Sequence, residues 1–255
     1  MRVSVRSDIG LVRQTNQDSY VHRVFERGSG LDSPPVHVFG VADGMGGYQA
    51  GEVASRLALD VVASEVEKAA KAGRPLGQAL SEAMIEANRE VVRQGLSDPT
   101  CTGMGTTVTV ALVSGGVLHV GHVGDSRAYI VRGGKLEQVT QDHSLVGELV
   151  RNGDITEEQA QMHPQRNILT QAFGSDLRVK PDLSTASLQD GDMVFLCTDG
   201  LTGAIQTAEI EDILAAAGDL DEAASKLVAI ANERGGHDNV TVLVAGPFRL
   251  GGDPL

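Results

Sequence analysis

The sequence is poor in aromatic residues and contains no tryptophan. Phe and Tyr together make up 3% of its 255 residues, so a core must be built mainly from Val, Leu, Ile and Ala. Hydrophobic residues still reach 41% of the chain, which is enough to bury a core and too many for a disordered protein. At about 100–200 residues per domain, the length fits one large domain or two small ones.

Cysteine is scarce as well, with Cys101 and Cys197 as the only two. Two cysteines cannot form a disulfide framework, and the apolar neighbours of Cys197 predict a thiol in the core. No apolar run approaches the roughly 18 residues that a membrane helix needs. The first ten residues, MRVSVRSDIG, are not followed by the apolar stretch of a secretory signal. We therefore expect a cytoplasmic protein with no membrane segment.

Basic residues are outnumbered by acidic ones. The 21 Lys and Arg residues against 34 Asp and Glu residues give a formal net charge of −13. A chain this acidic repels a polyphosphate backbone, so the composition argues against nucleic acid as a partner.

Apolar periodicity predicts many strands and two pairs of helices. Helical spacing runs from Ala54 to Val91 and again from Thr207 to Ala231. Short Gly-rich connections between the middle strands are typical of antiparallel hairpins. Paired helices beside antiparallel strands favour an α+β layered sandwich over simple βαβ alternation. The predicted strands are 3–5, 20–25, 36–42, 106–113, 117–123, 128–131, 135–139, 193–197 and 240–245.

A polar, irregular and weakly helical segment runs from Ser144 to Gly174. Within it, Thr156 followed by two glutamates predicts the cap of a short helix. About thirty residues of this kind inside a compact domain are typical of a functional flap.

Five aspartates stand at the ends of apolar strands. Each of the pairs Asp43-Gly44 and Asp199-Gly200 lies between a predicted strand and a helical segment, Asp125 follows a strand, and Asp18 and Asp238 precede strands. Gathered carboxylates repel one another unless cations neutralise them. Ligation by oxygen alone suits Mg²⁺ or Mn²⁺, and no His or Cys spacing indicates zinc. Two such cations would hold a bridging hydroxide and accept phosphate oxygens.

Arg13, five positions before Asp18, is a candidate for binding a phosphate group. An arginine fork binds a phosphate dianion in a bidentate way that lysine cannot match. Arg127 and Arg166 are alternatives for the same role.

Taken together, these segments resemble the metal-dependent serine/threonine phosphatases of type 2C, the PPM family. The matching pieces occur in the order of the family and span residues 2 to about 246. The segment 163–167 (HPQRN) and Asp-Gly-Met-Gly-Gly at 43–47 are similar to the bacterial branch. The matching pieces are Ser7-Asp8-Ile9-Gly10 with Arg13 and Asn16-Gln17-Asp18, Val41–Gly47, Gly105-Thr106-Thr107, Gly124-Asp125-Ser126-Arg127, Cys197–Leu201 and Asp238-Asn239-Val240-Thr241.

The resemblance implies a four-layer α-β-β-α sandwich, with two antiparallel sheets packed face to face and helix pairs outside. It implies one phosphatase catalytic domain at residues 1–248, a flap at about 144–175 and a short C-terminal tail at 249–255. The reaction it implies is hydrolysis of phosphoserine and phosphothreonine by direct attack of a metal-bridging hydroxide, with no phospho-enzyme.

The resemblance also assigns roles to individual residues. Asp43 would bridge two Mn²⁺ or Mg²⁺ ions, and the Gly44 carbonyl would bind one of them. Asp199 and Asp238 would complete the coordination of the other ion. Asp125 with Asp199 would hold a third ion that binds more weakly. Asp18 would orient metal-bound water, and Arg13 would clamp the phosphate.

Two positions depart from the family pattern. Gln17 replaces a glutamate that often precedes Asp18, so it adds no charge. Met45 stands where eukaryotic members carry a histidine that is a candidate general acid. The group that protonates the leaving oxygen is therefore left open between water and a histidine from elsewhere in the chain.

The family also indicates partners: phosphorylated proteins, among them a bacterial Ser/Thr kinase and its targets. The alternatives are a non-catalytic metal-binding pseudophosphatase and a phosphoesterase acting on small molecules. A structural calcium-binding module lacks the EF-hand spacing and does not account for Arg13.

Overall fold

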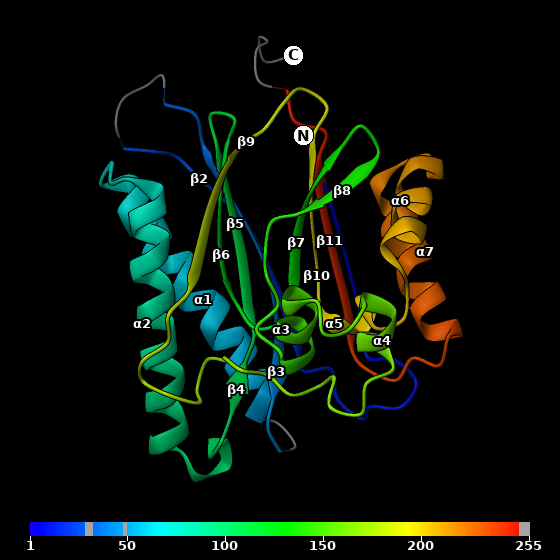
Figure 1. The fold of residues 1–255 in the computed structure, drawn as a ribbon. Helices are drawn as coiled ribbons and strands as arrows, with labels where there is room; N and C mark the ends of the chain where they lie inside the picture. The colour runs from blue at the N-terminus through cyan, green and yellow to red at the C-terminus, as the bar shows by residue number, and fades with distance from the viewer. Residues whose placement is uncertain (29–32, 48–49, 250–255) are drawn as a thin grey trace.

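The computed structural model describes residues 1–28, 33–47 and 50–249. Two antiparallel sheets lie face to face in it (Figure 1). The first sheet has the strand order β1-β11-β10-β7-β8, formed by β1 (Arg2–Asp8), β11 (Val240–Gly246), β10 (Met193–Cys197), β7 (Arg127–Arg132) and β8 (Lys135–Gln138).

The second sheet has the order β2-β3-β5-β6-β9, with a short strand β4 (Gly105–Thr106) paired to β3. Its strands are β2 (Asp18–Phe25), β3 (Val36–Met45), β5 (Val108–Ser114), β6 (Val117–Val123) and β9 (Asp182–Ser187).

Helix pairs cover the outer faces of both sheets, which gives four layers (Figure 1). Helices α1 (Ala50–Lys71) and α2 (Leu76–Ser97) lie over the second sheet, and α6 (Thr207–Ala216) and α7 (Leu220–Glu233) lie over the first. The predicted α+β four-layer sandwich is confirmed.

Alternation along the strands explains why they are apolar throughout. In β11, Val242 and Val244 face the α6–α7 layer, while Leu243 and Ala245 face the space between the sheets. Successive side chains point to opposite faces of a strand, and both faces are buried here, so the strand has no polar face.

The segment between β8 and β9 contains two short helices, α3 (Leu145–Asn152) and α4 (Glu157–Gln161). Ser144 caps the first helix through its side chain, and Gly153 ends it with a φ of 77°. Thr156 and Gln159 form a reciprocal capping box on α4, which confirms the cap predicted at Thr156. Both helices lie toward the end of the sandwich opposite to the N-terminus (Figure 1).

Several predicted bounds differ from the structure. Strand β3 continues through Asp43 and Gly44 to Met45, so the first Asp-Gly pair lies inside a strand end. Strand β9 was not among the predicted strands, and α7 has Asp219 as its N-cap. The remaining named elements are a one-turn helix α5 (Asp199–Thr202) and a 3₁₀ turn η1 (Pro99–Cys101).

Cys197 is a free and fully buried thiol, as predicted from its apolar neighbours. None of the helices in the described part of the chain has the length and apolar character needed to cross a membrane. From residue 250 onward, the tail expected at 249–255 lies outside the described residues.

Candidate active site

Asp18 and Asp43 lie opposite each other where β2 and β3 pair. The backbone of Asp43 is fixed by Thr107, whose hydroxyl accepts its N–H at 2.8 Å and whose own N–H donates to its carbonyl at 2.9 Å. Thr106 donates a second hydrogen bond to the same carbonyl. The hydrogen bonds from Thr106 and Thr107 therefore fix the position of the Asp43 backbone.

Asp199 and Asp238 come from the other sheet. Asp199 begins α5 directly after β10, and Asp238 lies two residues before β11, the neighbour of β10. Asn239 fixes this corner, because its side chain accepts from the Gln17 N–H and donates to the carbonyls of Ile9 and Thr15 at 2.9 and 3.0 Å. The loop that carries Arg13 is thereby held against the Asp238 segment.

Close backbone contacts explain the glycine of each Asp-Gly pair. A Cβ atom on Gly44 would lie 2.1 Å from the carbonyl oxygen of Gly51, and one on Gly200 would lie 1.9 Å from that of Asn239. Any other residue would push apart the two backbone segments. These Asp-Gly pairs are therefore not the ordinary turn signals that the dipeptide usually marks.

Burial and mutual repulsion govern the protonation of the cluster. Burial raises the pKa of Asp43 well above its usual value, and the charges of Asp199, Asp18, Asp125 and Asp238 raise it further. Burial likewise raises the pKa of Asp125, Asp199 and Asp18, the last to about 7. Such carboxyl groups cannot all be ionised at neutral pH without a compensating cation.

The residues fit a divalent cation on the evidence of two buried oxygens. Within the described residues, Oδ1 of Asp18 and Oδ1 of Asp199 have no hydrogen-bond donor. Buried acceptors normally find a partner, and a cluster of oxygen ligands suits a hard cation such as Mg²⁺ or Mn²⁺.

The carboxylates are close together but are engaged with other groups. The charge of Asp199 raises the pKa of Asp43, and Arg13 Nη2 donates to Asp238 Oδ2 at 2.7 Å. In the part of the chain that the structure describes, no three His, Cys, Asp or Glu side chains are arranged to hold one ion together. A cation that binds Asp238 Oδ2 would therefore replace the hydrogen bond from Arg13.

The three arginines weighed for phosphate binding differ in their surroundings. Arg127 is bound to Asp142 through three short contacts of 2.7–3.1 Å, which leaves its fork occupied. Arg166 is exposed on the segment after α4. Of the three, and within the described residues, Arg13 alone donates a hydrogen bond to one of the five aspartates. This hydrogen bond raises the pKa of its guanidinium.

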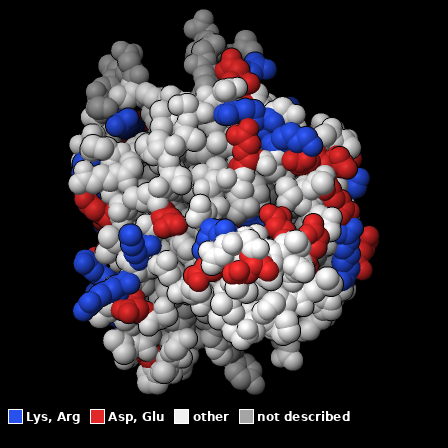
Figure 2. Space-filling model, in the orientation of Figure 1, with Lys and Arg blue, Asp and Glu red and all other residues white. Residues whose placement is uncertain are grey.

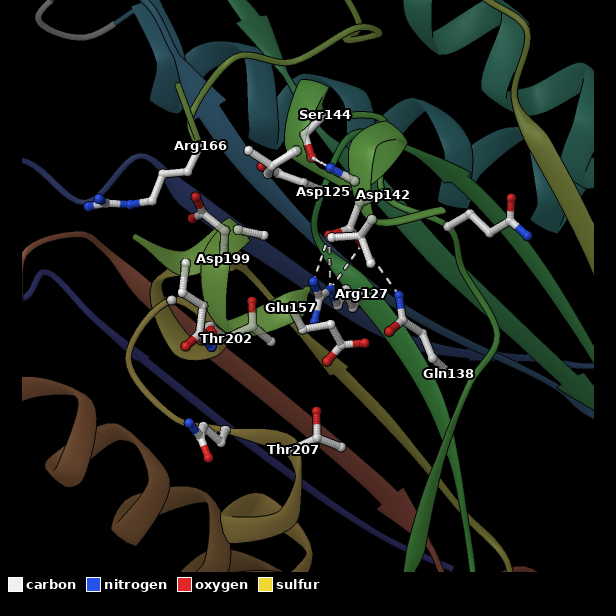
Figure 3. Close-up of a pocket in the computed structure, with 18 of the residues that line it drawn as sticks. Asp125, Arg127, Gln138, Asp142, Ser144, Glu157, Arg166, Asp199, Thr202 and Thr207 are labelled. Atoms are coloured by element: carbon white, nitrogen blue, oxygen red, sulfur yellow. Dashed lines mark hydrogen bonds and ion pairs between the residues drawn. The ribbon is translucent and has the colours of Figure 1, made fainter. Parts of the chain in front are cut away.

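A cavity of about 510 Å³ opens beside the cluster. Residues of α3, α4 and the start of α6 form its walls. Asp125 and Asp199 of the carboxylate cluster also line it (Figure 3). Glu157 and Arg166 line it from the segment 144–175. Acidic side chains surround α3 and α4 on this face of the molecule (Figure 2). The cavity thus connects the carboxylates with the surface.

The turn that carries Asp125 is held by His143. The N–H of His143 donates to the Gly124 carbonyl at 2.7 Å, and the Gly124 N–H donates to Nδ1 of the same ring at 3.2 Å. The His143 carbonyl also accepts the N–H of Thr170, so one residue joins the Asp125 turn to both ends of the segment 144–169.

The structure brings the predicted residues Arg13, Asp18, Asp43, Gly44, Asp125, Asp199 and Asp238 to one end of the sandwich. Sequence reasoning did not assign roles to Thr107, His143, Asn239, Thr198 or Thr241. All of them except His143 lie in the family motifs named above, but the sequence did not show which groups they contact. No signal in the sequence singled out His143.

Comparison with known proteins gives a consistent result. The sequence profile described as "Protein phosphatase 2C" matches residues 7–149. "Serine/threonine phosphatase stp" of Listeria innocua is 37% identical over 246 residues, which are 96% of this chain and 95% of that protein.

Solved structures are similar over the same length. The Mycobacterium tuberculosis serine/threonine phosphatase PstP/Ppp aligns with a TM-score of 0.83 and 38% identity, covering 96% of this chain and 97% of that one. The catalytic domain of a PstP in complex with two manganese ions aligns with a TM-score of 0.80 and 36% identity, covering 96% of each chain.

Proposed function

Since this chain belongs to the protein phosphatase 2C family, and is thus a metal-dependent serine/threonine protein phosphatase, we propose that its reaction takes place at the carboxylate cluster between the two sheets. The observation that supports this location best is the repulsion within the cluster, because Asp199 raises the pKa of Asp43 and of Asp125, and Asp238 raises the pKa of Asp199. Residues 1–248 are proposed as the catalytic domain.

Four groups would hold the two principal cations. They are the carboxylates of Asp43, Asp199 and Asp238 and the carbonyl of Gly44, while Asp125 with Asp199 would hold a weaker third. Bound Mn²⁺ or Mg²⁺ would neutralise the carboxylates and supply an activated water for direct attack on phosphorus. The manganese in a related PstP structure supports the class of cofactor.

The protein side chains bind and orient the phosphate. Arg13 reaches the cluster from a loop fixed by Asn239, and it is half exposed, with its Nη2 on Asp238. A phosphate dianion would compete with Asp238 for the guanidinium, and the arginine fork would then grip two of its oxygens. Asp18, which is buried with 8% of its surface exposed, would accept a hydrogen bond from water in the site.

Protonation of the leaving oxygen is not a task for Met45. Its thioether has no proton to give, and its backbone pairs with Gly105 of β4. Water is the proposed donor. His143, which holds the turn of Asp125, is buried and directs its Nε2 toward Asp182 at 3.1 Å, away from the cluster.

The proposed substrates are phosphorylated proteins, including a bacterial Ser/Thr kinase and its targets, by analogy with the bacterial phosphatases that this chain resembles. The cavity beside the cluster, lined by residues of α3 and α4, would give such substrates access to the carboxylates. A cytoplasmic location stays a prediction from the sequence.

A phosphothreonine peptide assay with Mn²⁺ and with EDTA tests the proposal. We expect turnover with Mn²⁺, none with EDTA, and a loss of about 100-fold or more in kcat for Asp199→Asn. The exposed residue Asp60 offers a matched control, since Asp60→Asn removes a surface carboxylate that is paired with Arg23 away from the cluster. Activity on a nucleotide panel but not on the peptide would point to a small-molecule phosphoesterase, and Mn²⁺ binding without any turnover to a pseudophosphatase.

A further inference from the structure

Two threonine hydroxyls converge on one oxygen of Asp18. Thr241 Oγ1 lies 2.7 Å and Thr198 Oγ1 lies 2.8 Å from Asp18 Oδ2. Both threonines are 0% exposed and Asp18 is 8% exposed, so bulk water does not compete for these bonds. Hydrogen bonds to an ionised carboxylate are the stronger kind.

The direction of the Thr198 hydrogen bond is determined by its second partner. The backbone N–H of Thr241 donates to Thr198 Oγ1 at 2.9 Å. A backbone N–H cannot accept, so the hydroxyl oxygen is the acceptor there and its own proton points to Asp18.

The direction of the Thr241 hydrogen bond is supported by a chain of donors behind it. The side-chain amide of Asn16 donates to Ser7 Oγ at 2.9 Å, and Ser7 Oγ lies 2.8 Å from Thr241 Oγ1. Since Thr241 gives its single proton to Asp18, Ser7 donates to Thr241. The Asp18 N–H closes the ring by donating to Asn16 Oδ1 at 3.1 Å.

The two oxygens of Asp18 are therefore inequivalent. Oδ2 accepts from two hydroxyls, whereas Oδ1 is buried and has no donor among the described residues. A rotation of the carboxylate out of its present plane would move the accepting oxygen away from both hydroxyls and leave two buried donors unsatisfied, which is costly. The plane of the carboxylate is thus fixed.

These hydrogen bonds also join the two sheets. Thr198 directly precedes Asp199 and Thr241 belongs to β11, so both come from the first sheet, while Asp18 begins β2 of the second. The same contacts that orient Asp18 therefore set the relative position of the two halves of the carboxylate cluster.

We propose that Thr198 and Thr241, with Ser7 behind Thr241, are positioning residues that block Oδ2 of Asp18 and present Oδ1 to a water molecule in the active site. This role rests on the proposed function, because it gives Oδ1 its partner only when the carboxylate cluster is the reaction centre. It assigns a task to three motif residues that touch neither the phosphate nor the proposed cations.

The test compares Thr241→Val with Thr241→Ser in the full chain. Valine keeps the shape and removes the hydroxyl, while serine keeps the hydroxyl. Mn²⁺ affinity is measured by titration calorimetry, kcat and KM on a phosphothreonine peptide, and the thermal midpoint in EDTA. We expect Thr241→Val to lose about 10- to 100-fold in kcat or Mn²⁺ affinity, as partners of metal-site groups usually do, with KM unchanged and with rescue by serine.

Ser114→Ala provides a control for the removal of a buried hydroxyl. Ser114 donates to the Pro34 carbonyl at the end of β5 away from Thr107, so the variant should lower the thermal midpoint and leave Mn²⁺ affinity and kcat as in the parent. If Thr241→Val does not fold, Ser7→Ala carries the test, with an expected loss of about fivefold for one hydrogen bond.

Equal Mn²⁺ affinity and equal kcat in the parent and Thr241→Val, or in the parent and Ser7→Ala, would overturn the proposed role. An equal loss in the valine and serine variants would overturn it as well, because shape and not the hydroxyl would then be responsible. A parent protein without peptide turnover would refute the proposed function instead, and the calorimetric comparison would still decide whether these hydroxyls govern the site.

Discussion

Arg13 donates from Nη2 to Oδ2 of Asp238 across 2.7 Å, although the two residues are 225 positions apart in the chain. One is the proposed phosphate ligand and the other a proposed cation ligand. In this arrangement the guanidinium occupies the carboxylate oxygen that a cation needs. Binding of metal and substrate would therefore give each of them a new partner.

Arg13→Ala should weaken the binding of phosphate and strengthen the binding of Mn²⁺. Loss of a charge-assisted hydrogen bond predicts an increase of about 10- to 100-fold in the inhibition constant of inorganic phosphate, with a parallel rise in KM. The Mn²⁺ concentration for half-maximal activity should fall, because Asp238 is released and a positive charge is removed. Both constants come from steady-state assays with varied phosphate and Mn²⁺.

Arg23→Ala is the matched control, since Arg23 forms a comparable surface pair with Asp60 at 2.7 Å. It should change neither constant. Unchanged phosphate inhibition in Arg13→Ala would move the phosphate ligand to the exposed Arg166.

Asp43→Asn should make the metal-free protein more stable at neutral and higher pH. Burial raises the pKa of Asp43 well above its unfolded value of 3.8, so the folded state binds the proton more tightly. The stability of the parent in EDTA is then lost progressively as pH rises above about 4 through the folded pKa. An asparagine resembles the protonated carboxyl and carries no such loss.

Thermal midpoints in EDTA at pH 4, 6 and 8 check this prediction. Each gain of about 1 kcal/mol moves the midpoint by about 2–4 °C in a chain of this size. The difference between variant and parent should be absent at pH 4 and largest at pH 8. With Mn²⁺ present the order should reverse, because the cation stabilises only the parent. A constant difference across the pH range would contradict the role of repulsion.

Asp125→Ala should raise the metal concentration needed for activity while sparing tight Mn²⁺ binding. Asp125 faces the cavity beside Asp199 (Figure 3) and is proposed as a ligand of the weakest cation only. Loss of one ligand predicts a shift of about tenfold or more in the Mn²⁺ activation curve. A calorimetric titration should show the tight sites unchanged, and an activation curve equal to that of the parent would argue against a third site.

Met45→His should favour poor leaving groups. A serine alkoxide needs a proton in the transition state, whereas nitrophenolate hardly does, so an added imidazolium should raise kcat/KM for phosphoserine peptides by about tenfold. The gain should be confined to pH values near or below neutral, where the imidazole is protonated. Rates for the peptide and for p-nitrophenyl phosphate from pH 5.5 to 8.5 distinguish the outcomes.

Equal changes for both substrates would refute an acid at this position. Met45 Cγ would lie 3.3 Å from a Cβ on Gly105, so the site is closely packed. Met45→Gln, which is polar but cannot act as an acid, is the matched control and should give no gain with either substrate.

The sequence alone predicted the layered fold and singled out the five aspartates that are proposed for the site. The apolar runs of β10 and β11 and the helix pairs around them are local patterns, because each reflects burial on both faces of a strand or on one face of a helix. The five aspartates could be singled out because each stands where such a run begins or ends. Strand β9 escaped this reading, since its residues Asp182–Ser187 are mostly polar and it is held as an edge strand by its backbone pairing with β6.

The tertiary structure alone decided how those aspartates are used. The contacts from Thr198 and Thr241 to Asp18 span 180 and 223 positions, and no periodicity carries information over such separations. Only the packing of one sheet on the other brings the hydroxyls to one carboxylate oxygen and leaves the other without a donor among the residues that the structure describes. Local sequence patterns thus show which residue types belong to the candidate site. The orientation of the Asp18 side chain, in contrast, is fixed by groups that come together only when the two sheets pack against each other.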